Sequence, residues 1–244
     1  MLTGVYDIFQ KKWNPVGTVW IYSDPHFSDK QLKDSIPNRP TDKELIERIN
    51  SKVGKNDTLI ILGDIGNIDC IRQLKGRYKV LLLGNHDKGK SNYLQKTITR
   101  TYEYEKYTKE QVLKDLKERY PNWIINEVYY QTEFHFLFKK WKCFLFNGLF
   151  DEVYTGPLMI GEKIILSHEP IPNLTWAINI HGHNHNKSKE TDKHYINVCA
   201  DVINYEPINL NKLLLEYGLS SIDSLHRITI DKATREEKDN NAKY

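Results

Sequence analysis

Residues 79–87, K-V-L-L-L-G-N-H-D, join a continuous apolar run directly to an amide, an imidazole and a carboxylate. The apolar run predicts a strand that is buried on both faces, as in α/β sheets. Asn85, His86 and Asp87 then follow the carboxyl end of that strand, where open α/β sheets collect their ligands. The stretch therefore predicts an α/β fold with a reactive loop at one edge of the sheet.

The same loop has a second interpretation. Residues 84–91 match G-x-x-x-x-G-K-[ST], the pattern of phosphate-binding P-loops. A P-loop needs a helix that begins at the loop, whereas residues 92–99 are β-branched in part and form a weak helix start. The P-loop interpretation would also leave the polar residues that follow the other apolar runs without a function. We therefore reject a P-loop NTPase.

Four other apolar runs end in polar clusters of the same kind. The clusters are residues 23–26 after the run 18–22, residues 63–64 after 58–62, residues 167–169 after 163–166, and residues 181–185 after 177–180. Because ligands gather at the carboxyl ends of the strands in such sheets, all five clusters are expected to form one site.

Helical segments between these runs predict βαβ units. Thr41 and Glu44 form a capping box that opens a helix over 41–53, with apolar residues on one face. A shorter helix is expected over 68–74 and another over 209–217.

Residues 95–142 interrupt this pattern and are interpreted as an α+β insertion between two core strands. The segment 108–120 is helical in pattern, and 129–138 alternates aromatic with polar residues, which predicts an antiparallel hairpin. Its aromatics either cap the site and stack on a nucleobase, or form a small core or a dimer contact. Residues 1–219 are expected to form a single domain, followed by a polar tail over 220–244.

The composition is that of a soluble globular protein, with 244 residues, 27% charged residues and 39% hydrophobic ones. A formal charge of +3 does not by itself indicate nucleic acid as a partner. The three cysteines lack metal-site spacing, and the start of the chain lacks a signal peptide. With no apolar run long enough for a membrane helix, we expect a cytoplasmic protein without membrane contact. The sequence does not predict the oligomeric state.

The polar clusters suit a pair of divalent metal ions, which need a shared carboxylate and further imidazole, amide and carboxylate ligands. Their order is D-x-H, G-D, G-N-H-D, H and G-H-x-H. In this the chain resembles the calcineurin-like metallophosphoesterase superfamily, in particular its small microbial and phage-type members, over about 18–92 and 146–215.

The resemblance implies a four-layer α/β sandwich, with two central mixed β-sheets flanked by helices. It implies two divalent metal ions, manganese before iron, zinc, nickel or cobalt, since the ligands are imidazole and oxygen without thiolate. The implied ligands are Asp24, His26 and His185 for one metal, Asp64 as the bridge, and Asn85, His168 and His183 for the second metal.

The implied reaction is hydrolysis of a phosphomonoester or phosphodiester by in-line attack of a metal-bridging hydroxide. His86 would be the general acid that protonates the leaving group, and Asp87 would orient His86. The substrate is expected to be a phosphoester, with nucleotides and nucleic acids included.

Three alternatives remain on the same fold: a metal-dependent nuclease, a cyclic-nucleotide phosphodiesterase, and a binding scaffold without catalysis. Residues 63–69 lack the Arg that the family's protein phosphatases carry after G-D, which argues against a phosphoprotein substrate. His181 is either structural or a support for the metal ligands.

Overall fold

The computed structural model describes residues 2, 4–87, 93–94, 96–133, 138–186 and 190–217. Residues 88–91 of the P-loop pattern, residues 134–137 of the predicted hairpin and the predicted tail 220–244 lie outside these ranges. Across the described ranges, no helix is long and apolar enough to cross a membrane.

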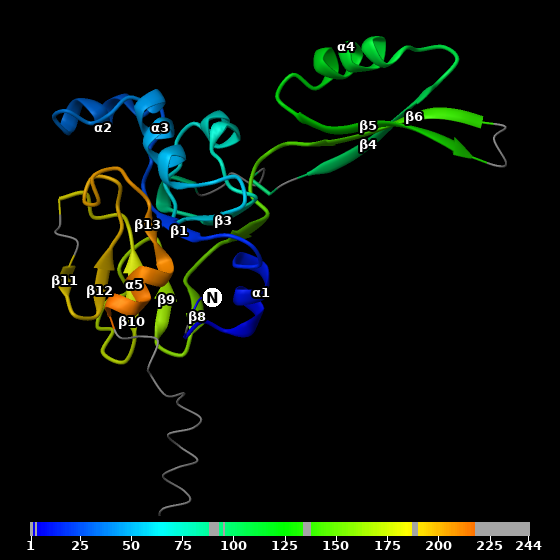
Figure 1. Cartoon of the computed structure of the whole chain (residues 1–244). Helices are drawn as coiled ribbons and strands as arrows, with labels where there is room; N and C mark the ends of the chain where they lie inside the picture. The colour runs from blue at the N-terminus through cyan, green and yellow to red at the C-terminus, as the bar shows by residue number, and fades with distance from the viewer. Residues whose placement is uncertain are drawn as a thin grey trace, which may run out of the picture.

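Two five-stranded mixed sheets form the body of the molecule (Figure 1). The first has the order β13 (Ile208–Asn209), β1 (Val19–Tyr22), β2 (Thr58–Ile61), β3 (Tyr78–Leu82), β7 (Glu152–Tyr154), and only β13 runs antiparallel to its neighbour. The second has the order β11 (Glu190–Asp192), β12 (Tyr195–Asn197), β10 (Ile178–His181), β9 (Ile164–Leu166), β8 (Leu158–Gly161), with β9, β10 and β12 parallel. The predicted α/β architecture with two central mixed sheets is confirmed.

The main hydrophobic core lies between the two sheets. Alternate residues of the first sheet, such as Ile60 and Val80, share one buried cluster with Leu166 and Ile180 of the second. This cluster is closed by α1 (Asp7–Trp13) and by α5 (Leu210–Glu216), which lies where the sequence predicts a helix over 209–217. Apolar burial on this face holds the two rows of strand ends beside each other.

The outer face of the first sheet is covered by α3 (Asp42–Lys52) and the 3₁₀ helix η1 (Ile68–Gln73). The predicted capping box is present, because Thr41 accepts from the amide of Glu44 and Glu44 accepts from the amide of Thr41. On the second sheet, Ile165 packs instead against Leu174 and Ala177 of the loop that follows β9. A loop therefore forms this outer layer.

The insertion is a separate three-stranded antiparallel sheet with a helix on one face. Its strands are β4 (Thr97–Glu103), β5 (Ile124–Glu133) and β6 (Phe138–Phe146), in the order β4-β6-β5, and its helix is α4 (Lys109–Arg119). Figure 1 shows it projecting to one side of the two central sheets. Trp123 and Trp141 pack against the core of the insertion, formed by Val112, Leu116, Cys143 and Leu145. These contacts favour the small-core interpretation of its aromatics over a cap on the site.

A substitution in α3 tests the layer that covers the first sheet. Ile49 is fully buried there, so Ile49→Ala should lower the free energy of unfolding by about 2–5 kcal/mol through lost burial and a residual cavity. Urea denaturation measures this change. Glu47→Ala on the exposed face of the same helix is the control and should stay within about 0.5 kcal/mol of the wild type. Equal losses in both variants would contradict the packing described for α3.

Candidate metal centre

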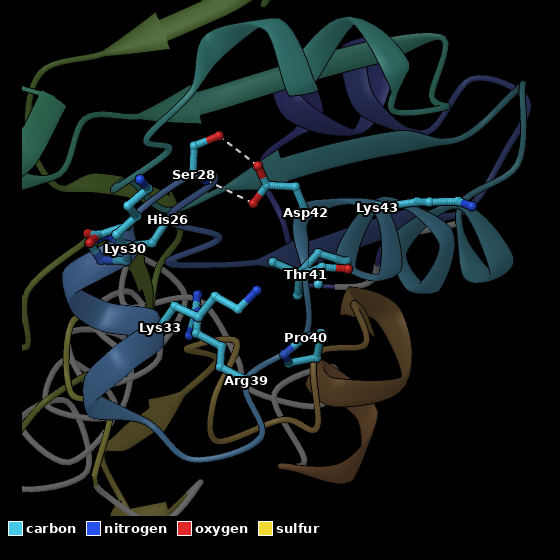
Figure 2. Close-up of a pocket in the computed structure, with 11 residues that line it drawn as sticks. His26, Ser28, Lys30, Lys33, Arg39, Pro40, Thr41, Asp42 and Lys43 are labelled. Atoms are coloured by element: carbon cyan, nitrogen blue, oxygen red, sulfur yellow. Dashed lines mark hydrogen bonds and ion pairs between the residues drawn. The ribbon is translucent and has the colours of Figure 1, made fainter.

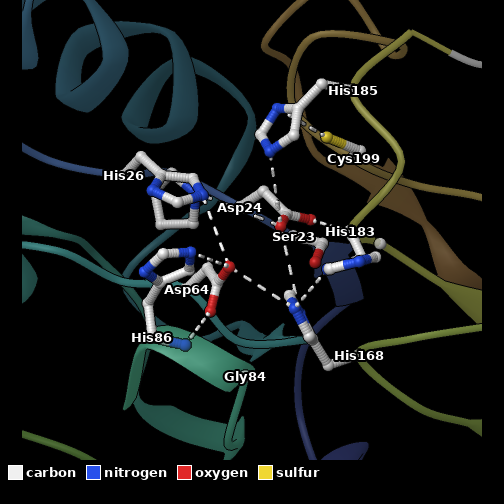
Figure 3. Close-up of polar contacts among 12 residues, drawn as sticks. Ser23, Asp24, His26, Asp64, Gly84, His86, His168, His183, His185 and Cys199 are labelled. Atoms are coloured by element: carbon white, nitrogen blue, oxygen red, sulfur yellow. Dashed lines mark hydrogen bonds and ion pairs between the residues drawn. The ribbon is translucent and has the colours of Figure 1, made fainter. Parts of the chain in front are cut away.

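The predicted site residues meet at the carboxyl ends of five strands, β1, β2, β3, β9 and β10 (Figure 3). Asp24, His26 and His185 form one group whose ligand atoms all lie within 4.8 Å of one another. The Nε2 atoms of His26 and His185 each lie 4.0 Å from Asp24 Oδ1. The first predicted ligand set is thus brought together from both sheets.

A second group lies directly beside the first. Asp64, His168 and His183 also have their ligand atoms within 4.8 Å of one another. Asn85 joins this group, because its Oδ1 lies 2.8 Å from His168 Nε2. His183 Nδ1 lies 3.2 Å from the same nitrogen. All seven predicted ligands therefore converge, and their role in binding metal stays a prediction.

Asp64 lies between the two groups. Its Oδ2 is 3.4 Å from His26 Nε2 and 3.4 Å from His168 Nε2. Its Oδ1 accepts a hydrogen bond from the backbone amide of His86 at 2.9 Å. A carboxylate that faces both imidazole groups has the position that a bridging ligand needs.

The outer nitrogens of three of these imidazoles have partners that only accept hydrogen bonds. The pairs are His26 Nδ1 with Asp29 at 3.1 Å, His168 Nδ1 with the carbonyl of Leu62 at 2.8 Å, and His185 Nδ1 with Asp201 at 2.6 Å. Each Nδ1 must therefore carry the proton. In the neutral ring this leaves the Nε2 lone pair directed at the centre, which is the tautomer that a metal ligand requires.

Buried charge at the centre favours a cation. Burial acts to raise the pKa of the Asp64 carboxyl, but the His168 and His26 imidazoles, whose Nε2 atoms each lie 3.4 Å from its Oδ2, hold that pKa well below its ordinary value. Burial acts to lower the pKa of His168, yet Asp64 and Asp24 outweigh it and raise the pKa to about 9. The two carboxylates thus attract positive charge strongly, and protons compete for the same ligands.

Two atoms at the centre are buried without a hydrogen-bond partner among the described residues, Asp24 Oδ1 and His26 Nε2. Leaving buried polar atoms unpaired costs free energy. A divalent ion bound between them would satisfy both atoms. The donor set of carboxylate, amide and imidazole groups therefore fits the divalent ions that the sequence predicts.

The backbone of the site is strained. Asp24, His26, Asp64 and His183 have φ values of 56°, 44°, 53° and 67°. This left-handed region is unfavourable for residues with a Cβ, and such strain collects at functional sites. Four of the seven predicted ligands therefore hold conformations that the surrounding contacts must enforce.

His86 lies at the rim of the centre, with 65% of its side chain exposed. Its Nε2 is 4.0 Å from Asp64 Oδ2. A cavity of about 300 Å³ opens over the centre and includes His86, His183 and His185 in its wall. An imidazole in this place can reach both a bound phosphoester and solvent, as a general acid must.

Asp87 lies away from this rim and is fully buried. Its carboxylate accepts hydrogen bonds from the backbone amides of Asp64 at 2.7 Å, Gly84 at 3.0 Å and Ile65 at 3.3 Å. These bonds tie the loop after β3 to the loop after β2. We therefore assign Asp87 the positioning of Asp64, which differs from the predicted orientation of the His86 side chain.

A buried ion pair supports the first group and was missed by the sequence reasoning. Arg39 pairs with Asp201, and the two side chains are 2% and 4% exposed. Arg39 also donates to the carbonyls of Asp24 at 3.1 Å and Pro25 at 2.9 Å. Because Asp201 holds His185, this pair connects the loop after β1 to a ligand from the second sheet. The resemblance covers Asp201, whereas nothing in the sequence pattern marks Arg39.

His185, Cys199 and Asp201 form a third group with metal-ligand spacing. Burial raises the pKa of the Cys199 thiol well above its ordinary value, so it stays protonated. Asp201 is already paired with Arg39. We therefore interpret this group as support behind His185. His181 is fully buried, with Nδ1 2.8 Å from the carbonyl of Gly182, which agrees with a structural role.

Comparison with known proteins identifies the family of the chain. The family profile of the calcineurin-like phosphoesterases matches residues 17–196, which include all seven predicted ligands, His86 and Asp87. The chain belongs to the calcineurin-like phosphoesterase family. Phosphoesterases of this family are metal-dependent hydrolases. The side chains that converge at the strand ends are of the types that bind divalent metals, which agrees with the family.

No curated protein matches the chain. A crystal structure of a protein of unknown function from Aquifex aeolicus is similar at 20% sequence identity, with a TM-score of 0.48. The alignment covers 81% of this chain and 97% of that chain. At this level of similarity it adds no argument about function.

A glycine beside the ligands gives a direct test of the geometry. A Cβ at Gly182 would run into Ser23 Oγ and Asp24 Oδ2, so Gly182→Ala should displace Asp24 and weaken divalent metal binding at least 10-fold. Isothermal titration with Mn²⁺ measures this. Gly156→Ala is the control, because a Cβ there meets no atom within 4 Å. Wild-type affinity for Mn²⁺ in the Gly182→Ala variant would contradict the position of Asp24 as a metal ligand.

The ion pair behind His185 is tested separately. Asp201→Asn keeps the shape of the side chain but removes its charge, and should weaken metal binding about 10- to 100-fold, as loss of the hydrogen-bond partner that orients a metal-binding histidine does. Asp69→Asn makes the same change at an acid paired with Arg72 outside the metal groups and is the matched control. Circular dichroism confirms that each variant is folded. Equal metal affinity in the two variants would remove Asp201 from the support of the site.

Proposed function

We propose that the protein hydrolyses a phosphomonoester or phosphodiester with two divalent metal ions bound at the strand ends. The observation that carries this proposal is the position of Asp64 Oδ2, 3.4 Å from an imidazole of each ligand group. One carboxylate so placed supports a pair of metals better than two isolated ones. Family membership supports the phosphoester substrate class.

Two bound cations would supply a water of lowered pKa as nucleophile and would neutralise charge on the phosphoryl group. The protein's own residues fix where this occurs. Asp64 keeps the two groups together, while Asp29, Leu62 and Asp201 hold three imidazoles with Nε2 inward. Ligands that are oriented in advance need little rearrangement on binding metal or substrate.

His86 is the proposed general acid. Its imidazole is exposed at the cavity over the centre, so it can donate a proton to the leaving alkoxide and then exchange that proton with solvent. The backbone amide of His86 is held by Asp64. This bond fixes the backbone of His86 beside Asp64, at the rim of the centre. The proposed role therefore rests on position and access.

We propose manganese as the preferred metal, since the donors are oxygen and imidazole without an available thiolate. We also propose a cytoplasmic location. The three cysteines are free and buried, which is typical of proteins in a reducing compartment.

The roles of the metals and of His86 are tested with two diesters. After chelation, activity on bis(p-nitrophenyl) phosphate should vanish and return with Mn²⁺. His86→Asn should reduce kcat about 100-fold or more on a diester with an alkyl leaving group, because that group needs a proton. The loss should be smaller with p-nitrophenolate, which leaves without one.

His194→Asn is the control for this experiment, because His194 is bonded to the carbonyl of Ala177 and stands in neither metal group. It should keep wild-type rates on both esters. Full activity of the His86 variant on the alkyl diester would contradict the general-acid role. Full activity of the chelated wild type would contradict the metal-dependent function itself.

A further inference from the structure

A second cavity, of about 380 Å³, adjoins the metal centre on the side of α2 (Lys30–Ser35) and the start of α3 (Figure 2). His26 and Asp29 line both this cavity and the one over the centre. The two spaces are therefore neighbours that share one wall. A substrate with its phosphoester at the metals can extend into the second cavity.

The acidic groups of this cavity are already engaged within the chain. Asp29 accepts from the amide of Leu32 at 3.0 Å and pairs with His26 Nδ1. Asp42 accepts from the amide of Ser28 at 2.8 Å and from its hydroxyl at 2.6 Å. Their carboxylates are thus directed at groups of the protein.

The basic side chains of this cavity are not all paired with acidic groups of the protein. Lys30 and Lys33 line the cavity and form no ion pair among the residues that the structure describes. Arg39 lies in the wall as well, paired with Asp201. Figure 2 shows Lys33 and Arg39 reaching into the space below His26, whereas Lys43 points away along α3. The cavity therefore offers an excess of positive charge beside the metals.

We propose that this cavity binds a second phosphate of the substrate, next to the phosphoester that is hydrolysed. Lys33 and Lys30 are the groups that hold it, because both line the cavity without an ion-pair partner among the described residues. This proposal rests on the proposed function and names its substrate class, a phosphoester that carries a neighbouring phosphate. Such a phosphate occurs in an oligonucleotide and in a bisphosphorylated alcohol, so the shared chemistry is the second anion.

The test compares substrates that differ only in the second phosphate. Wild-type protein should show kcat/KM at least 10-fold higher for the thymidine dinucleotide with a terminal phosphate than for the dinucleotide without one. Lys33→Ala with Lys30→Ala should reduce that ratio to about 1, mainly through KM. Added salt should weaken binding of the phosphorylated dinucleotide less in this variant than in the wild type, because fewer charge pairs remain to be screened.

Lys43→Ala is the matched control, because its side chain belongs to the same wall but points away from the space. It should keep the wild-type ratio. A pair of alkyl substrates, a diol bisphosphate and the alkyl monophosphate, shows whether the phosphate alone is recognised or a nucleoside is needed too. Equal kcat/KM for each pair of substrates, or equal effects of the Lys33/Lys30 and Lys43 substitutions, would overturn the proposal.

Failure of the proposed function is recognised separately, by the absence of any hydrolysis of both p-nitrophenyl phosphate and bis(p-nitrophenyl) phosphate. In that case calorimetric titration of the two dinucleotides into the protein decides the question by the ratio of their Kd values. A ratio of 10 or more that is lost in the Lys33/Lys30 variant supports the second-phosphate site. A ratio near 1 in the wild type overturns it.

Discussion

Asp64 faces two groups of imidazoles at once, and each part of the residue has its own partner. Its Oδ2 lies at equal distance from His26 and His168, its Oδ1 accepts from the amide of His86, and its own amide donates to Asp87. A shift of Asp64 would therefore pull the two ligand groups apart and would also move the backbone of His86. The constraint is possible because β1, β2 and β3 are parallel and in register, so that the loops after them begin at the same level of the sheet.

The site is held together at a cost in local stability. Buried carboxylates, left-handed backbone and unpaired polar atoms are each unfavourable in the absence of a bound cation. The core between the two sheets offsets this cost, since it buries large apolar residues from both sheets, α1 and α5. The Arg39–Asp201 pair adds a fixed connection between the sheets at the site itself. Much of the rigidity of the ligands therefore comes from a core that lines neither cavity beside the site.

Much of this arrangement is local in the sequence and could be predicted. Apolar runs ending in polar clusters indicate buried strands with ligands at their ends, and the capping box at Thr41 fixes the start of α3 within the sequence itself. Arg39 could not be found in this way, because its partners Asp24 and Asp201 lie 15 and 162 positions away. The left-handed backbone of His26 and His183 also has no sequence signal, since neither residue is glycine. Asp87 was placed at the site by its motif, but only the fold shows that backbone amides use its carboxylate.

The most direct test of this account is the position of metal in a crystal of the Mn²⁺-loaded protein, located by anomalous scattering at the manganese edge. Two peaks are expected, one among Asp24, His26 and His185 and one among Asn85, His168 and His183, with Asp64 between them. A single peak, or a peak at Cys199 and Asp201 in place of these, would contradict it.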